Sequence, residues 1–168
     1  MPRVRLIHWK KSEAAEHFKA LDAGGYATEY DEQFRPGLMK QWRENPPDAF
    51  AIDLSRLPSH GKEIAIALRQ YKQTRTVPLV FCGGDAAKVS AIRELLPDAA
   101  YCEVKGLIRT IQKSLKAPPK DPVRPTAMMD RYQSRTAAEK LGIKPDSVVG
   151  VVNPPRDVDA IRPLAAPD

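Results

Sequence analysis

The sequence DAFAIDLSRLPSHG, residues 48–61, contains a short apolar run that leads directly into a carboxylate. Residues 49–52 are apolar, Asp53 follows them, and turn-prone residues separate Asp53 from a helical pattern over 62–71. Such a run, bounded by turn residues, is typical of a strand buried on both faces of a parallel sheet. Ligand-binding groups in these sheets lie just past the carboxyl ends of the strands. The position of Asp53 therefore indicates a functional site, although an Asp after a strand often only caps the next turn.

Strand and helix patterns alternate over the first 115 residues. Strands are predicted over 4–9, 26–30, 49–54, 77–82 and 99–104, and helices over 10–21, 36–44, 61–72, 86–96 and 107–115. Helices that alternate with short apolar strands predict a parallel sheet covered by helices on both faces. Right-handed crossovers leave few topologies. We predict a three-layer α/β fold, a flavodoxin-like (βα)5 sheet of order 2-1-3-4-5, with the more apolar first, third and fourth strands in its centre.

The C-terminal part of the chain differs in composition, because residues 117–168 hold nine of the sixteen prolines. We predict a main domain over 1–116, an extended Pro-rich linker over 117–125, and a helix-strand arm over 126–168. The arm would contain one helix over 126–141, ended by Gly142, and one strand over 147–152. One helix and one strand cannot bury a core alone. The arm is therefore expected to dock on the main domain, pair with another chain or stay partly mobile.

Composition indicates a globular protein with one core. Of the 168 residues, 42% are hydrophobic and 29% are charged, as in ordinary folded domains. No apolar run approaches the ~20 residues that span a bilayer, and the N-terminus has no signal-peptide pattern. We expect no membrane association and a cytoplasmic location. Cys82 and Cys102 match no metal-binding spacing and are expected to be reduced, buried thiols.

The net charge of +6 makes anionic partners worth considering. Lysine and arginine are interleaved with acidic residues on most predicted helices, so a solvated surface explains the charge better than a clustered nucleic-acid footprint. Nucleic-acid binding is not favoured but stays an alternative. Its candidate contacts are Lys113, Lys116, Lys120 and Arg124, and a steep fall of affinity with salt would mark it.

The three histidines are the other candidates for chemistry. His17 lies in the helix predicted over 10–21 and is expected on the surface. His8 and His60 could both approach Asp53, giving a two-histidine, one-carboxylate set that suits a transition metal. Nothing in the spacing requires such a set, and no nucleophile motif or Gly-rich nucleotide fingerprint accompanies it. We therefore predict no metal site, no cofactor and no catalytic residues, so the protein is expected not to be an enzyme.

The first 115 residues resemble the receiver domain of two-component response regulators. The resemblance lies in the order of the predicted elements, in their total length, in the apolar run into Asp53 and in Gly61 eight residues further on. Asp53 matches the phospho-accepting aspartate of that family, and Lys105 matches its lysine after the fifth strand. The resemblance also implies an interaction surface on the fourth helix, fifth strand and fifth helix, with Arg93, Tyr101, Arg109 and Lys113.

The sequence departs from the receiver pattern around Asp53. Receivers carry two neighbouring acidic residues after the first strand, which bind Mg²⁺ with the acceptor aspartate, and the matching residues here are His8 and Trp9. The Thr or Ser that follows the fourth strand in the family is replaced by Gly83. Mg²⁺ requires several oxygen ligands, and phosphoryl transfer depends on that ion. The resemblance therefore implies a degenerate site, in which Lys105 could simply pair with Asp53.

The preferred interpretation is a pseudo-receiver, a non-catalytic signalling and protein-interaction module. Its partner would be another protein or a second copy, bound through the surface around Tyr101 or through strand 148–152, because an exposed apolar strand is a template for pairing. The alternative is an atypical response regulator that is phosphorylated on Asp53 in a phosphorelay and requires Mg²⁺.

Overall fold

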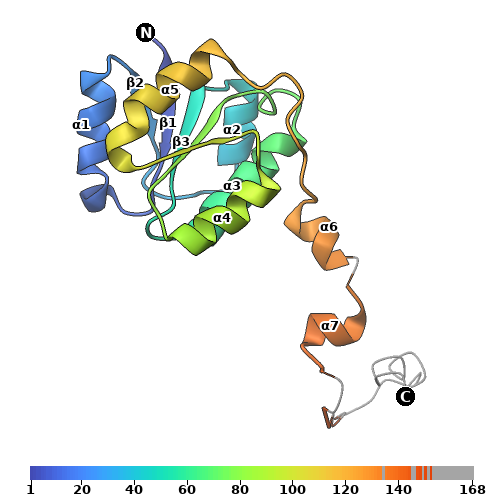
Figure 1. Cartoon of the computed structure of the whole chain (residues 1–168). Helices are drawn as coiled ribbons and strands as arrows, with labels where there is room; N and C mark the ends of the chain where they lie inside the picture. The colour runs from blue at the N-terminus through green and yellow to red at the C-terminus, as the bar shows by residue number, and fades with distance from the viewer. Residues whose placement is uncertain (134, 145–146, 149, 151, 153–168) are drawn as a thin grey trace. The chain divides into compact units, whose positions relative to one another are not determined.

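A computed structural model describes residues 1–133, 135–144, 147, 148, 150 and 152. The chain divides into two compact units, residues 1–125 and 126–168. The first unit contains the whole sheet (Figure 1).

Five parallel strands form the sheet, in the order β2-β1-β3-β4-β5. They are β1 (Arg3–Ile7), β2 (Ala27–Tyr30), β3 (Ala49–Asp53), β4 (Leu79–Cys82) and β5 (Ala100–Cys102). The predicted flavodoxin-like fold and strand order are confirmed. All five residues of β3 and all four of β4 are buried, which explains why these strands are continuous apolar runs.

Helices cover both faces of the sheet (Figure 1). They are α1 (Ala15–Ala23), α2 (Leu38–Glu44), α3 (Pro58–Gln70), α4 (Ala86–Leu95) and α5 (Leu107–Lys116), with two 3₁₀ turns, η1 (Lys11–Glu13) and η2 (Val104–Gly106). Two core clusters separate the layers. Phe50 and Ile52 of β3 pack with α2, α3 and α4, whereas Ala49 and Ala51 belong to the cluster of α1 and α5. Successive strand residues point to opposite faces, so one short strand supplies both cores.

Two helix starts differ from the sequence prediction. The helix expected over 10–21 is divided into η1 and α1, and the residue before α1 is Ala14, whose side chain cannot cap the helix. Helix α3 begins at Pro58, three residues before the predicted start. Proline at the first helical position loses no intrahelical hydrogen bond, since that N–H has no partner in a helix. Gly61 lies inside α3, where a Cβ would be 3.0 Å from Ile52 Cγ2.

Residues 117–125 contain no helix or strand, as expected, but they pack against the rest of the first unit. Pro122 and Pro125 are buried. The backbone N–H of Val123 donates to Asp98 Oδ2 at 2.7 Å, and Gln70 Nε2 donates to the carbonyl oxygen of Pro125 at 2.7 Å. These contacts make the segment part of the unit that carries the sheet.

The second unit has two short helices, α6 (Met128–Gln133) and α7 (Ala137–Leu141), so the single helix predicted over 126–141 is wrong. Thr136 has extended backbone angles and forms a capping box with Glu139, which starts a new helix. Gly142 ends α7 in a left-handed conformation, as predicted. Of the predicted strand 147–152, the four described residues are outside any strand, and Val149 and Val151 lie outside the described residues.

None of the described helices combines the length and the apolar character needed to cross a bilayer.

Candidate functional site

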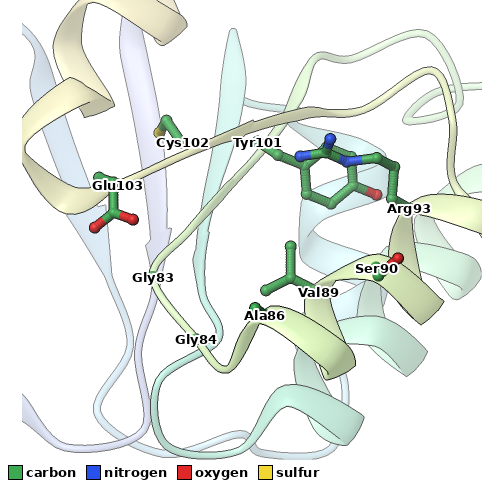
Figure 2. Close-up of a pocket in the computed structure, with 9 residues that line it drawn as sticks. All are labelled: Gly83, Gly84, Ala86, Val89, Ser90, Arg93, Tyr101, Cys102 and Glu103. Atoms are coloured by element: carbon green, nitrogen blue, oxygen red, sulfur yellow. The ribbon is translucent and has the colours of Figure 1, made fainter.

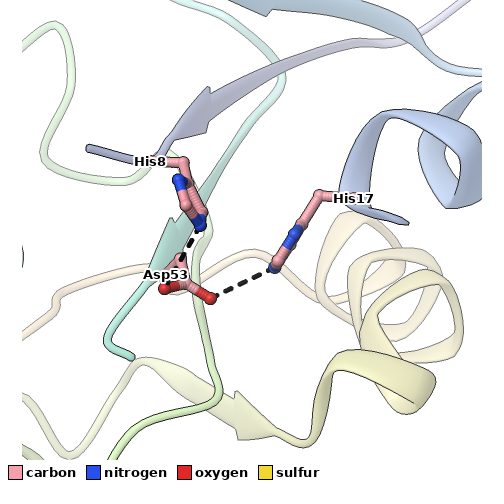
Figure 3. A group of neighbouring side chains, drawn as sticks. All are labelled: His8, His17 and Asp53. Carbon is pink, nitrogen blue, oxygen red and sulfur yellow. Dashed lines mark ion pairs between the residues drawn. The ribbon is translucent and has the colours of Figure 1, made fainter. Parts of the chain in front are cut away.

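The candidate site lies at the carboxyl edge of the sheet, where two neighbouring strands end. Ile7 of β1 is in register with Ile52 of β3, so His8 and Asp53, each one residue further on, arrive at the same edge. His17 comes from the first turn of α1, on the face that also buries Ala14 and Leu21. The two imidazoles approach the Asp53 carboxylate from different elements (Figure 3).

The three side chains form a close, buried cluster. His8 Nε2 is 3.7 Å from Asp53 Oδ1, and His17 Nε2 is 3.2 Å from Asp53 Oδ2. The imidazole ring centroids are 5.3 Å apart. Asp53 is 1% exposed, His17 4% and His8 6%. Each oxygen of the carboxylate therefore faces one imidazole in a site that solvent hardly reaches.

Hydrogen bonds from Ser55 and Lys10 hold two members of the cluster in place. The backbone N–H of Ser55 donates to Asp53 Oδ1 at 2.9 Å, and the Ser55 hydroxyl donates to Asp53 Oδ2 at 3.3 Å. The backbone N–H of Lys10 donates to His8 Nδ1 at 3.1 Å. Since this nitrogen is an acceptor, neutral His8 carries its proton on Nε2, facing the carboxylate.

Burial and hydrogen bonding set the charge of the cluster. Burial by itself would raise the pKa of Asp53, but the close approach of the His17 imidazole, the hydrogen bond from the Ser55 N–H and the charges of both imidazoles outweigh it, and the pKa is lowered. Burial lowers the pKa of His8, against the opposing effect of the Asp53 carboxylate. The site therefore favours an ionised Asp53 beside a neutral His8.

His17 is less fully satisfied than its neighbours. It is buried, yet neither ring nitrogen makes a hydrogen bond of normal geometry to any described residue, although Nε2 is within ion-pairing distance of Asp53. Buried polar atoms without partners are uncommon and call for an explanation. His17 is therefore the member of the cluster with free bonding capacity.

An exposed ion cluster lies beside the site. Glu13 of η1 accepts hydrogen bonds from Arg56 Nη1 at 2.9 and 3.0 Å and pairs with Lys10 Nζ at 2.7 Å. These bonds connect the segment after β1 with the loop after β3. Two cations thus engage the Glu13 carboxylate. They lower its pKa, and the hydrogen bond from Lys10 is the largest cause.

The side chains around Asp53 do not fit Mg²⁺. This ion prefers near-octahedral oxygen ligands. Here the groups facing both carboxylate oxygens are imidazoles, which suit transition metals instead. Among the described residues, the groups that face the Asp53 oxygens are thus the two imidazoles and the N–H and hydroxyl of Ser55.

The structure brings together a different pair of histidines from the one expected. His17 was predicted on the surface and is buried against Asp53, whereas His60 is exposed and its ring lies tilted against that of Trp9, with centroids 5.3 Å apart. The spacing of His17 from Ala14 and Leu21, three and four residues away, places it on the apolar face of α1. That spacing was the available signal for its burial.

The other predicted receiver positions lie apart from the carboxylate or contact it indirectly. Lys105 is exposed on η2, and no ion pair joins it to Asp53 among the described residues. Gly83 has φ +66°, and a Cβ there would be 2.5 Å from Ser55 Oγ and 3.4 Å from Asp53 Oδ2. The Ser55 hydroxyl thus occupies the space into which a side chain at position 83 would project.

The predicted interaction surface includes a pocket beside β5 with a volume of about 380 Å³ (Figure 2). The Arg93 guanidinium lies over the Tyr101 ring, 4.6 Å from its centroid. The Tyr101 hydroxyl donates to the carbonyl oxygen of Leu96 at 2.9 Å. Arg109 and Lys113 are exposed on α5. The four residues therefore supply cationic and aromatic groups on adjacent elements.

The fold of this chain is similar to that of solved structures. One is described as a response regulator from Chloroflexus aurantiacus, 23% identical with a TM-score of 0.55 over 69% of this chain and 99% of that one. Another is the receiver domain of a sensor histidine kinase from Pseudomonas aeruginosa with a magnesium ion in its active-site cleft, 19% identical with a TM-score of 0.52 over 69% and 98%.

No protein-family model and no curated protein sequence matches the chain. The structural neighbours establish that it has the fold of a response regulator receiver domain.

Proposed function

We propose that this protein is a pseudo-receiver, a cytoplasmic, non-catalytic signalling module that works through protein-protein contacts. The observation that carries the proposal is the environment of Asp53. Both carboxylate oxygens face imidazoles and accept hydrogen bonds from Ser55, and the residue is 1% exposed.

This environment opposes phosphorylation for two physical reasons. A phosphoryl donor must reach the carboxylate, whereas Asp53 is 1% exposed and each of its oxygens faces an imidazole. Phosphoryl transfer also needs cations that neutralise developing charge, and the groups beside Asp53 do not suit Mg²⁺. We infer that the protein acts through the protein-binding surface of this fold and does not use Asp53 as a phosphate acceptor.

The proposed partner is another protein, bound by the surface of α4, β5 and α5. Arg93, Tyr101, Arg109 and Lys113 present aromatic and cationic groups there. Tyrosine and arginine are enriched at the energetic centres of protein interfaces. The stacked Arg93–Tyr101 pair is the candidate centre of this surface, for a partner protein or a second copy.

The test is exposure of the full chain to Mg²⁺ with beryllofluoride, a mimic of the phosphoryl group, monitored by backbone amide NMR. A pseudo-receiver gives the same spectrum with and without the reagent at millimolar concentration. Asp53→Asn is the matched control, because it keeps the side-chain shape and removes the nucleophilic carboxylate. Mg²⁺-dependent shifts near Asp53, Gly83 and Lys105 in the wild type, and their loss in the control, would contradict the proposal.

The second candidate is an atypical response regulator phosphorylated on Asp53. Two observations favour it: the lowered pKa keeps the carboxylate ionised, and the Ser55 hydroxyl is 3.3 Å from Oδ2. The beryllofluoride experiment separates the two candidates, since only the second responds.

A further inference from the structure

Three side chains with metal-binding atoms meet at the edge of the sheet. His8, His17 and Asp53 each offer one ligand atom, and these atoms lie within 4.8 Å of one another. All three residues are buried, and their side chains converge on one point (Figure 3). The sequence predicted no metal site because nothing in the spacing required a set of His8, His60 and Asp53, whereas the structure places His17 in that set in place of His60.

We propose that His8, His17 and Asp53 form a binding site for a divalent transition-metal ion such as Zn²⁺. Two imidazoles and one carboxylate suit Zn²⁺ and similar ions, and three protein ligands leave one position of a tetrahedral ion open. Ligands ~2.0–2.1 Å from a tetrahedral ion are about 3.4 Å apart. His17 Nε2 is 3.2 Å from Asp53 Oδ2 and His8 Nε2 is 3.7 Å from Asp53 Oδ1, so each imidazole lies near this separation from a different carboxylate oxygen. One ligand atom from each of the three residues lies within 4.8 Å of the other two, so side-chain adjustments of about 1 Å would complete the set around one ion.

His17 supplies independent support for the proposal. The residue is 4% exposed, it points at the carboxylate, and neither ring nitrogen makes a hydrogen bond of normal geometry to a described residue. A metal ion bound at Nε2 would engage this nitrogen without breaking an existing hydrogen bond of His17. His17 and Asp53 are therefore the primary ligands.

His8 joins as the third ligand with a proton rearrangement. Its Nδ1 accepts a hydrogen bond from the Lys10 N–H, so the neutral ring carries its proton on Nε2. Binding through Nε2 requires that proton to leave; it moves to Nδ1, and the hydrogen bond from Lys10 is lost. The bonding atom must carry no proton, and the shift to Nδ1 frees Nε2 without net release of a proton from the neutral ring.

The experiment titrates the full chain with Co²⁺ alone, whose visible spectrum reports coordination number, and then displaces it with Zn²⁺. We expect one Co²⁺ per chain with the intense bands of four- or five-coordination, and full displacement by Zn²⁺. His17→Gln should weaken binding at least 100-fold, whereas His60→Gln, which changes the exposed histidine outside the cluster, should bind as the wild type does. Equal binding by His17→Gln, or loss of binding in His60→Gln, would overturn the assignment.

A second measurement protects the test against a variant that fails to fold. Imidazole ¹⁵N NMR of the wild type should show Zn²⁺-dependent shifts for His8 and His17 and none for His60. No shift at His8 and His17 in the presence of Zn²⁺ overturns the proposal without any variant.

The metal proposal concerns the same residues as the pseudo-receiver proposal, but the two fail separately. A chain that ignores both Zn²⁺ and beryllofluoride is still a pseudo-receiver and has no metal site. A chain that responds to Mg²⁺ and beryllofluoride is not a pseudo-receiver, whatever its behaviour with Zn²⁺.

Discussion

The charge state of His8 links the site to the pH dependence of folding. Its pKa in the folded protein is below the value of about 6.5 expected for the unfolded chain. Below pH 6.5 the unfolded state therefore binds more protons, and stability falls as the pH falls through this range. Asp53, whose pKa is also lowered, adds a further loss only below about pH 4. Urea unfolding with a chelator at pH 7.5 and 5.5 should show a lower midpoint at the lower pH.

The control for this prediction is His8→Gln, which removes the titrating ring and keeps an N–H donor. Its loss of stability between pH 7.5 and 5.5 should be smaller than that of the wild type. His60→Gln, at an exposed histidine, should keep the full wild-type dependence. A wild-type midpoint that is unchanged or rises at pH 5.5 would show that His8 is not held neutral in the folded protein.

Gly83 carries two separate constraints, and substitution can measure each. Its φ of +66° disfavours a side chain, and a Cβ would lie 2.5 Å from Ser55 Oγ. Gly83→Ala should cost about 1–3 kcal/mol of unfolding free energy. Gly25→Ala, at φ +76° with no atom within 4 Å of the new Cβ, should cost only about 1 kcal/mol.

Removing the Ser55 hydroxyl tests the origin of that difference. In the Ser55→Ala background, Gly83→Ala should cost less than in the wild type, because the clashing oxygen is gone. A double-mutant cycle from urea unfolding gives the coupling energy. Independent effects of the two changes would show that the contact is not the cause.

Sequence reasoning located Asp53 and His8 but not their partner. Asp53 and His8 follow apolar strands, and the parallel arrangement alone places both at one edge of the sheet. His17 is brought there by its place on the buried face of α1, with Ala14 and Leu21. The spacing of these three residues carried that signal, but it was not used. His60 was the natural alternative because it follows Asp53 in the chain, but its ring lies tilted against that of Trp9.

At the scale of elements, the close packing of α3 on β3 explains a glycine within a helix. A Cβ at Gly61 would be 3.0 Å from Ile52 Cγ2 and 3.1 Å from Leu54 Cδ2, tighter than ordinary contacts. Alanine has the higher helix propensity by about 1 kcal/mol, yet overpacking a core costs about 1–3 kcal/mol. Gly61→Ala should therefore be neutral to destabilising in thermal unfolding. A gain in stability comparable to the propensity difference would show that the helix and strand have room to spare.

The strands were easier to predict than the helix ends. Each central strand is a buried run whose composition leaves no competing structure, and every strand was placed to within about three residues. One helix was predicted over 126–141, with Gly142 as its stop, but the capping box of Thr136 and Glu139 divides it. Local side-chain bonds to the backbone decide such boundaries, and a periodicity count does not include them.

For the whole molecule, the contacts of residues 117–125 predict where the chain can be shortened. Pro122 and Pro125 are buried, and the segment is fixed by hydrogen bonds to Asp98 and Gln70. A chain ending at residue 125 should keep the full stability of the first unit, whereas one ending at 116 should lose about 1–3 kcal/mol of unfolding free energy, from the exposed apolar surface and the lost hydrogen bonds. Urea midpoints of the two truncations give the comparison. Equal midpoints would mean that the Pro-rich segment adds no stability and acts only as a connection.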